Sequence, residues 1–397
     1  MTDFNATRAM FDLPEGLIYL DGNSLGPLPR TANHQVDALL REEWGKQLIK
    51  GWNACGWMDT PRRIGDRIAK IIGARPGTVV IGDTLSIKVY QALAAALALR
   101  PERSVVLSDT GNFPTDLYMA EGLLKTMGGH VELRLVEPHE IEDAIDDSVA
   151  AVMLTQADYR SGRLHNMRSV STAAHAAGAL TVWDLAHTAG AVQVRLDEDG
   201  ADFAVGCTYK YLNGGPGAPA FIYVAERHQH DSTPALSGWL GHEQPFAFDL
   251  DYRPGAGIDR MRVGTPPIIA CAALDAALDI WDIVDIRDVR ARSIELSECF
   301  IEEVEHRCPQ LTLASPRDPQ VRGSQVSFEF EEGYAVIQAL IANDVIGDFR
   351  APNKLRFGFT PLYLSAEEVI KAAQILERIM SDRLWDCPEF KTMAAVT

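Results

Sequence analysis

Residues 179–217, ALTVWDLAHTAGAVQVRLDEDGADFAVGCTYKYLNGGPG, decide the fold of this chain. The apolar run at 179–183 ends in Asp184, and a second apolar run at 201–206 leads to Lys210. Short apolar runs of this kind are typical of buried strands. Side chains that follow such strands gather at the carboxyl edge of a parallel sheet. We therefore expect Asp184 and Lys210 to lie at the same edge of one sheet.

These two residues are the groups that a pyridine-aldehyde cofactor needs. The amine of Lys210 can form a Schiff base with the aldehyde. The carboxylate of Asp184 can keep the ring nitrogen protonated, which makes the ring an electron sink. Each residue alone has a plainer interpretation, as a solvated loop lysine or as a turn residue after a strand. Both together, in this order, favour the cofactor.

The alternation of strand and helix patterns extends from about residue 64 to residue 225. The further strands and the helices between them are predicted at 78–81, 87–99, 104–107, 115–126, 149–154 and 169–177. Strands that alternate with helices indicate a mostly parallel sheet that is covered by helices on both faces. We therefore expect an α/β large domain.

The pattern changes near Pro266-Pro267. A long helical stretch at 268–306, with a break near Ile286, is followed by short strands and a last helix at about 366–383. This order predicts a smaller C-terminal α+β domain that hangs on a connecting helix. We expect three parts, namely an N-terminal segment at 1–45, a large cofactor-binding domain at 46–285 and a small domain at 286–397.

Composition and charge exclude several classes of partner. The 397 residues include 37 Lys and Arg against 55 Asp and Glu, a net charge of −18. This acidity argues against nucleic acid and against an anionic membrane surface. The longest fully apolar stretch, residues 92–99, is too short to span a bilayer. The N-terminus shows no secretory signal, and six scattered cysteines suggest a reducing cytoplasm.

Four other segments have both a functional and a plainer interpretation. The turn at 82–86 is a candidate phosphate cradle or an ordinary helix cap. Phe113 is a candidate stacking residue or a core phenylalanine. Arg356, inside an apolar strand pattern, would bind a carboxylate bidentately or form a structural ion pair. The polar segment at 228–231 contains two histidines, but it reads as a surface turn, and no metal site is expected.

Several segments together carry a family resemblance. They are DLAH at 184–187, YKYLN at 209–213, YLDGNSLGP at 19–27, NFPTD at 112–116, DYRSG at 158–162, GWLGH at 238–242, RVGTPP at 262–267, and Arg356-Phe357 leading to Pro361-Leu362-Tyr363. In these segments the chain resembles the kynureninases, which are pyridoxal-phosphate hydrolases of the aspartate-aminotransferase fold group. Residues 52–57 match that family only loosely.

The resemblance implies roles for the matching positions. Lys210 would hold pyridoxal 5'-phosphate and act in catalysis with Tyr209 and Asp184. The cofactor would also be contacted by Leu85, Ser86, Phe113, His187, Trp239 and Thr265, and Trp239 and Thr265 would come from a second subunit. The substrate would be bound by Arg356 at its α-carboxylate and by Ser24, Trp52 and Thr265 at its aryl end.

The resemblance also implies an activity. The chain would be a cytoplasmic homodimer that hydrolyses L-kynurenine to anthranilate and L-alanine in tryptophan catabolism and NAD biosynthesis, with 3-hydroxykynurenine as a second candidate substrate. Two alternatives remain, namely another enzyme of the same fold (a cysteine desulfurase or a class V aminotransferase) and a non-catalytic pyridoxal-phosphate-binding protein. The loop at 315–323 lacks the cysteine that a desulfurase needs. The intact set of Lys210, Asp184 and Arg356 argues against a non-catalytic protein.

Overall fold

A seven-stranded sheet forms the centre of the large domain in the computed structural model, which describes residues 1–392. In the order of the sheet, its strands are β2 (Val79–Ile81), β8 (Phe221–Val224), β7 (Phe203–Gly206), β6 (Leu180–Asp184), β5 (Val149–Thr155), β3 (Val105–Asp109) and β4 (Glu132–Val136). β8 runs antiparallel to both of its neighbours, and the other neighbouring pairs are parallel. The predicted α/β class with a mostly parallel sheet is confirmed.

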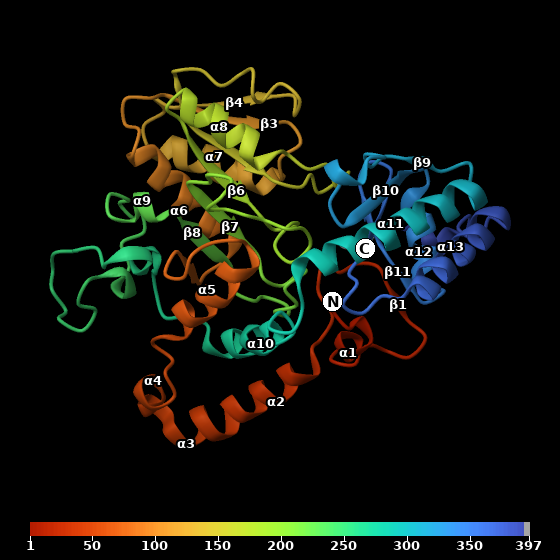
Figure 1. Cartoon of the computed structure of the whole chain (residues 1–397), viewed down its shortest axis with the longest axis horizontal. Helices are drawn as coiled ribbons and strands as arrows, with labels where there is room; N and C mark the ends of the chain where they lie inside the picture. The colour runs from red at the N-terminus through yellow and green to blue at the C-terminus, as the bar shows by residue number, and fades with distance from the viewer. Residues whose placement is uncertain (393–397) are drawn as a thin grey trace.

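Helices cover both faces of this sheet (Figure 1). One face packs on α6 (Leu85–Ala98) and α7 (Pro114–Thr126), while the other packs on α5 (Thr60–Ile71), α8 (Met167–Ala176) and α10 (Ile268–Leu278). The two faces alternate along each strand, because successive side chains point to opposite sides. Every residue of β5 and β6 is buried, as expected of strands covered on both faces.

The small domain follows at the C-terminal end and lies to one side of the large domain (Figure 1). Its antiparallel sheet has the order β12 (Asp348–Arg350), β13 (Lys354–Gly358), β10 (Gln325–Glu329) and β9 (Thr312–Leu313). Its helices are α11 (Ile286–Arg307), α12 (Gly333–Ile341) and α13 (Ala366–Ser381). α13 begins with a capping box in which Ser365 and Glu368 each bond the backbone N–H of the other.

The N-terminal segment contacts both domains. Its strand β1 (Ile18–Tyr19) pairs in parallel with β11 (Val345–Ile346) of the small domain, and the Thr7 hydroxyl of α1 (Phe4–Arg8) donates to the Leu362 carbonyl of that domain. α2 (Arg30–Ala38) packs on α10 of the large domain. The segment between β1 and α2 therefore passes between the domains. The domain boundaries at 45/46 and 285/286 stay predictions.

The remaining helices are short. They are the π-helix η1 (Leu39–Trp44), α3 (Gly45–Gln47), α4 (Gly51–Ala54), α9 (Glu226–Gln229) and the 3-10 helices η2 (Leu48–Lys50), η3 (Trp239–Gly241), η4 (Gly257–Met261), η5 (Pro319–Val321) and η6 (Pro388–Phe390). Within residues 1–392, no helix is both long and apolar enough to cross a membrane.

Candidate active site

The structure brings Lys210, His187 and Asp184 together at the carboxyl edge of the large sheet. β6 and β7 are parallel neighbours, with Asp184 opposite Val205, so the residues that follow the two strands lie side by side. Lys210 Nζ is 2.9 Å from His187 Nε2. The backbone N–H of Ala186 donates to Asp184 Oδ1 over 2.8 Å. The predicted proximity of Asp184 and Lys210 thus follows from adjacent parallel strands.

Burial sets the charge state of His187. Its ring is 5% exposed, and its Nδ1 has no hydrogen-bond partner among residues 1–392. Burial, together with the cations Lys210, Arg356 and Arg350, lowers the pKa of His187 well below its usual value. The ring is therefore neutral near pH 7. A neutral ring can accept a hydrogen bond from the amine of Lys210 at Nε2.

Asp116 is a residue that sequence reasoning missed. It lies in the first turn of α7, is 2% exposed, and its Oδ2 has no hydrogen-bond partner within residues 1–392. Burial and the neighbouring Asp184 raise the pKa of Asp116 well above its usual value. Burial also raises the pKa of Asp184, but Lys210 opposes that shift. The pair therefore holds a proton mainly on Asp116, which leaves the negative charge on Asp184. Asp116 belongs to the NFPTD motif, and that was its one signal in the sequence.

Tyr209 lies directly before the lysine, and its ring centroid is 5.9 Å from Lys210 Nζ. Burial and the neighbouring Cys207 thiol raise the pKa of Tyr209. The phenol is therefore protonated at neutral pH and can act as a hydrogen-bond donor. Its backbone oxygen accepts the N–H of Gly26 over 2.7 Å. This bond fixes the N-terminal segment against the lysine loop, the loop after β7 that contains Lys210.

The turn from β2 to α6 has the features of a phosphate cradle. Thr84 is the N-cap of α6, but no side chain caps the first turn. The amides at the start of the helix, at Leu85 and Ser86, therefore remain available to a ligand. Asp83 holds the turn in a left-handed conformation with φ of 54°. The plainer alternative of a side-chain cap is not what the structure shows.

Phe113 is not a core residue. It is 36% exposed, precedes α7, and packs edge to face on Tyr159 with ring centroids 5.1 Å apart. Two hydrogen bonds and one close contact connect the Phe113 backbone to Asp184. The Phe113 N–H donates to Asn112 Oδ1, Thr155 Oγ1 also donates to Asn112 Oδ1, and Thr155 lies 3.3 Å from Asp184 Oδ2. Phe113 is therefore held in a fixed position relative to Asp184.

These groups together fit pyridoxal 5'-phosphate. The buried Asp184 carboxylate suits a pyridinium nitrogen. The buried Nδ1 of His187 has no hydrogen-bond partner among residues 1–392, so it is available to a polar group of a ligand. The uncapped start of α6 suits the phosphate. The exposed ring of Phe113 offers a stacking surface.

Arg356 forms the structural ion pair that was one of its two expected roles, while its role toward the substrate stays a prediction. Its bidentate fork faces Asp348 of the neighbouring strand β12. Its Nε donates to Asp348 Oδ1 over 2.7 Å, and its Nη2 donates to Asp348 Oδ2. Nη2 also bonds Ser24 Oγ over 2.9 Å, and Nη1 bonds the Tyr159 carbonyl over 2.6 Å.

Since a guanidinium has five N–H groups, one N–H on Nη1 of Arg356 has no hydrogen-bond partner among residues 1–392. Both Arg356 and Asp348 are 1% exposed. Cross-strand pairing places them together, and no feature of the sequence around Asp348 indicated it.

Two further ionisable residues adjoin this pair. Arg350 Nη2 lies 2.7 Å from Asp348 Oδ2, and Arg356 and Arg350 lower the pKa of Asp348 although burial opposes ionisation. Asp21 follows β1, and its Oδ1 has no hydrogen-bond partner in the described part of the chain. Burial and the charge of Asp348 raise the pKa of Asp21 to about 7. The Arg356 site therefore contains a carboxyl group that titrates near neutral pH.

Trp52 and Trp239 pack on other aromatic residues, and Thr265 lies near the start of α6 rather than near Lys210. Trp52 packs edge to face on Trp57 at 5.6 Å, while Trp239 is 41% exposed and packs on Phe246 at 5.7 Å. Thr265 is exposed. No hydrogen bond or ring contact within residues 1–392 joins any of the three to Lys210. One chain therefore does not assemble the full predicted set.

Comparisons with known proteins identify the family. Residues 289–376 match the family model for the kynureninase C-terminal domain. Over 397 aligned positions, the chain is 49% identical to a kynureninase from Pseudomonas fluorescens, across 98% of this chain and 95% of that relative. The chain belongs to the kynureninase family. A kynureninase from Burkholderia pseudomallei (strain 1106a) matches with the same identity and coverage.

The kynureninase family consists of pyridoxal-phosphate-dependent hydrolases that act on a carbon–carbon bond, and the chain shares this cofactor and class. Solved structures show the same fold. A cysteine desulfurase from Thermococcus onnurineus NA1 aligns with a TM-score of 0.80 at 19% identity, over 95% of this chain and 98% of that one. A C-DES mutant with glycine covalently linked to its PLP cofactor aligns with a TM-score of 0.79 at 15% identity, over 93% and 98%.

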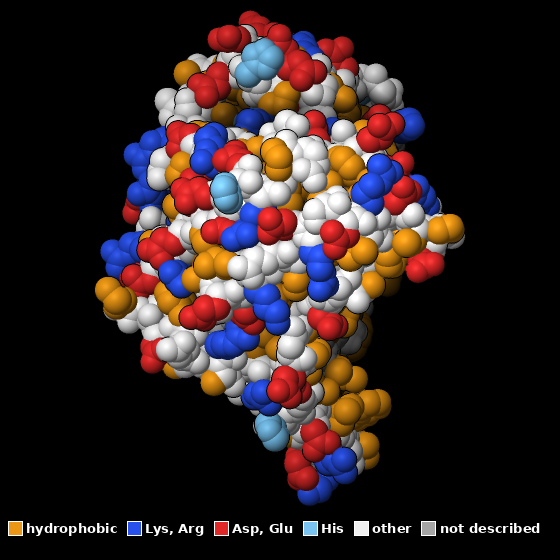
Figure 2. Space-filling model, turned by 90° about the vertical axis from the view of Figure 1, so that its right-hand side faces the viewer, with side chains coloured by type: hydrophobic (Ala, Val, Ile, Leu, Met, Phe, Trp, Pro, Cys, Tyr) orange, Lys and Arg blue, Asp and Glu red, His pale blue; other side chains and the backbone are white. Residues whose placement is uncertain are grey.

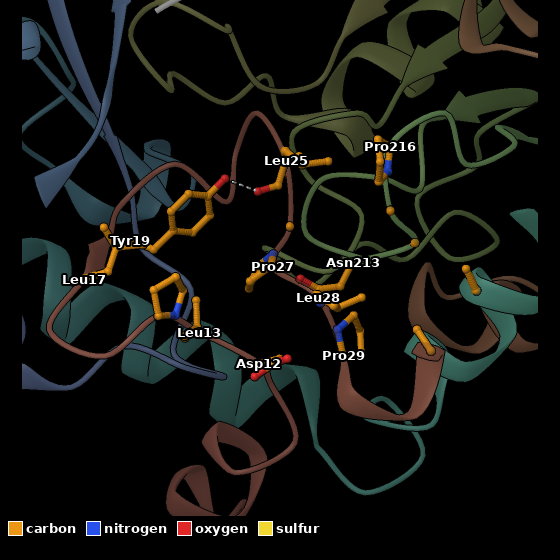
Figure 3. Close-up of a pocket in the computed structure, with 16 residues that line it drawn as sticks. Asp12, Leu13, Leu17, Tyr19, Leu25, Pro27, Leu28, Pro29, Asn213 and Pro216 are labelled. Atoms are coloured by element: carbon orange, nitrogen blue, oxygen red, sulfur yellow. Dashed lines mark hydrogen bonds between the residues drawn. The ribbon is translucent and has the colours of Figure 1, made fainter. Parts of the chain in front are cut away.

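An apolar hollow adjoins the lysine loop of this family member (Figure 3). It has a volume of about 280 Å³ and lies between the N-terminal segment and the loop at 213–216. Its wall includes Leu25, the residue after Ser24, and Tyr19, whose hydroxyl donates to the Leu25 carbonyl over 2.7 Å. The hollow therefore borders the turn at Ser24 rather than the carboxyl groups of Asp184 and Asp116.

The two histidines at 228–231 make separate contacts. His228 Nε2 is 2.7 Å from the buried Asp202, and His230 Nδ1 is 2.7 Å from Asp231 at the surface. Asp202 also accepts hydrogen bonds from Arg227 and from the Thr181 backbone. The segment thus ties α9 to the start of β7.

Proposed function

We propose that Lys210, Asp184 and Tyr209 carry the kynureninase reaction in this chain, the hydrolysis of the Cβ–Cγ bond of L-kynurenine to anthranilate and L-alanine. Pyridoxal 5'-phosphate, when bound, supplies the electron sink that this bond cleavage requires. The observation that carries the proposal is the 2.9 Å contact between Lys210 and His187 beside buried Asp184. It occurs in a chain that is 49% identical to a kynureninase over nearly its whole length.

Lys210 transfers the Cα proton of the substrate, and Asp184 keeps a negative charge at the ring nitrogen of the cofactor. Neutral His187 orients the amine of Lys210 through Nε2. The Ala186 N–H donates to the Asp184 carboxylate and holds it in place. A fixed general base and a fixed counter-charge are what proton abstraction at Cα needs.

Tyr209 acts as the acid when water adds to the side-chain ketone. Its raised pKa keeps the phenol protonated at neutral pH, so the phenol can donate to an oxygen on which negative charge develops. Because the phenol already carries its proton at that pH, Tyr209 is not available as a base. Of the two roles expected from the sequence, acid and base, Tyr209 therefore takes that of the acid.

The cofactor contacts come from three elements. The first amides of α6, at Leu85 and Ser86, bind the phosphate. Phe113 stacks on the ring, and His187 contacts the ring hydroxyl. The uncapped helix start and the exposure of Phe113 support these roles.

The active sites are shared within a homodimer, in which Trp239 and Thr265 complete the phosphate site of the other subunit. Exposed apolar side chains support a protein partner, since large patches of this kind mark interaction sites. On the segment that follows Trp239, Phe246 is 63% and Phe248 is 79% exposed. A second set of exposed apolar residues comprises Leu40, Trp44, Leu48 and Ile49. Hydrophobic side chains also gather on the projecting lower end of the molecule in Figure 2.

Substrate recognition divides between two ends of the ligand. The remaining N–H of Arg356 binds the α-carboxylate, while Ser24, Trp52 and Thr265 surround the aryl group. Trp52 is bulky, and it would narrow the space beside a 3-hydroxyl group. L-kynurenine is therefore preferred over 3-hydroxykynurenine, by a moderate factor.

The chain acts in the cytoplasm, in tryptophan catabolism by the kynurenine pathway that leads to NAD biosynthesis. It binds neither nucleic acid nor membranes. The net charge of −18 and the scattered cysteines support these assignments.

The test is a substrate panel with purified protein and added pyridoxal 5'-phosphate. Anthranilate fluorescence and L-alanine are measured with L-kynurenine, and sulfide and L-alanine are measured with L-cysteine. Equal amounts of anthranilate and alanine from kynurenine, with no sulfide from cysteine, are expected. Sulfide release without anthranilate would instead indicate a desulfurase, and no product from either substrate would indicate a non-catalytic protein.

A further inference from the structure

A fully buried lysine lies beneath the phosphate turn. Lys88 is the fourth residue of α6 and is 0% exposed. Its Nζ bonds Asp83 Oδ2 over 3.2 Å, Gln91 Oε1 over 2.9 Å and the Met261 carbonyl over 3.2 Å. An ammonium group has three N–H donors, so every donor of Lys88 has an acceptor. Complete pairing of this kind is what a buried charge requires.

The first of these contacts holds the turn that presents the phosphate-binding amides. Asp83 directly precedes the N-cap Thr84 and has φ of 54°, in the region that disfavours residues other than glycine. The Asp83 carbonyl accepts the Ala220 N–H over 3.0 Å. The carboxylate of Asp83 would repel a phosphate dianion at Leu85 and Ser86 unless a cation compensates its charge. Lys88 supplies that cation.

The third contact reaches a different part of the chain. The Met261 carbonyl also accepts Gln91 Nε2 over 3.3 Å, so two side chains of α6 hold it. Met261 ends η4 and leads into residues 262–267, which include Thr265. Val263 of the same segment accepts the Leu240 N–H over 3.2 Å, next to Trp239. Lys88 therefore connects the phosphate turn to the segment that carries Thr265 and that contacts the residue next to Trp239.

The two connected parts face each other across a narrow gap. Residues 82–83 and Lys88 line one side, and residues 262–266 line the other. The gap has a volume of about 20 Å³, so a shift of the turn would press on the 262–266 segment.

We propose that Lys88 is a positioning residue that neutralises Asp83 and couples phosphate binding at the α6 turn to the order of residues 257–267. This inference rests on the proposed function, in which the turn binds the cofactor phosphate and Thr265 serves the other subunit. Phosphate in one site thereby helps to arrange the residues that complete the next site.

The first experiment measures dissociation constants of pyridoxal 5'-phosphate and of pyridoxal, which lacks the phosphate, for the apoprotein. Lys88→Met should weaken binding of the phosphorylated form at least about tenfold, because a charged hydrogen bond is lost and Asp83 is left uncompensated. Binding of pyridoxal should stay unchanged. Lys125→Met, an exposed lysine on the neighbouring helix α7, is the matched control and should change neither constant.

A second variant separates the loss of charge compensation from general misfolding. Lys88→Met combined with Asp83→Asn removes the unpaired carboxylate together with the lysine, and it should recover most of the preference for the phosphorylated form. Hydrogen exchange of residues 257–267 in the apoprotein then tests the coupling. Inorganic phosphate should slow exchange there in the wild type and in the Lys125→Met variant, but not in either Lys88 variant.

The outcomes separate the two levels of the proposal. If the wild type binds pyridoxal as tightly as its phosphate ester, the assignment of the turn as a phosphate site is wrong. If the wild type prefers the ester and Lys88→Met keeps the same preference, the role of Lys88 alone is overturned. If phosphate slows exchange of residues 257–267 equally in the wild type and in the Lys88 variants, the coupling is overturned.

Discussion

Replacement of Arg356 by leucine should damage both stability and substrate binding. The change removes four hydrogen bonds, two to Asp348 and one each to Ser24 and the Tyr159 carbonyl. It also leaves the carboxylate of Asp348, which is 1% exposed, with Arg350 as its remaining cation. Loss of one partner from a buried ion pair costs about 3–5 kcal/mol. Because Arg350 stays 2.7 Å away, we expect the lower end, about 3 kcal/mol.

The loss of substrate binding should be separable from the loss of stability. A charged hydrogen bond to the α-carboxylate contributes about 1.5–3 kcal/mol, which corresponds to an increase in KM of about 10- to 100-fold. The double variant Arg356→Leu/Asp348→Leu removes the unpaired charge, so it should recover much of the stability. It should not recover the wild-type KM, because the Arg356 N–H that binds the α-carboxylate of the substrate is still missing.

Two measurements decide this prediction. Urea denaturation of the wild type, both single variants and the double variant gives the coupling energy between Arg356 and Asp348. Steady-state kinetics with kynurenine gives KM and kcat for each soluble variant. A double variant with both normal stability and normal KM would show that Arg356 serves the fold alone and does not bind the substrate.

Three further predictions follow from the same site. Lys210→Ala should abolish turnover while the purified variant still binds cofactor noncovalently, and substantial residual activity would exclude Lys210 as the catalytic amine. Trp52→His should shift the ratio of kcat/KM toward 3-hydroxykynurenine by a factor of about 10 or more, and an unchanged ratio would place Trp52 outside the aryl pocket. Because protonated Asp21 becomes an anion as pH rises through about 7, KM for kynurenine should increase across that range. Asp21→Asn should flatten this increase, and an identical pH profile would show that Asp21 does not face the substrate.

Local sequence patterns predicted the large domain well. The strands expected at 78–81, 104–107 and 149–154 correspond to β2, β3 and β5, because continuous apolar runs identify strands buried on both faces. β4 was missed, since its residues are exposed or half-buried at the edge of the sheet. The antiparallel direction of β8 and the pairing of β1 with β11 were also missed, because both depend on contacts between distant segments.

The candidate site could be predicted only where a motif lies directly after a strand. Lys210 and Asp184 met this condition, and they lie at the same edge of the sheet. The Asp348 partner of Arg356 comes from a neighbouring antiparallel strand, whose register no local pattern specifies. Asp116 and Lys88 looked like ordinary helix residues. Their burial results from packing on other elements, which the sequence around them does not encode.

The most direct test of the proposed bond cleavage follows L-kynurenine labelled with ¹³C at Cβ during incubation with the purified, cofactor-loaded protein. We expect the label in the methyl group of L-alanine, in an amount equal to the anthranilate released, and we expect neither product from Lys210→Ala. Recovery of the label in unchanged kynurenine, or in a transamination product that keeps the Cβ–Cγ bond, would contradict the proposed cleavage.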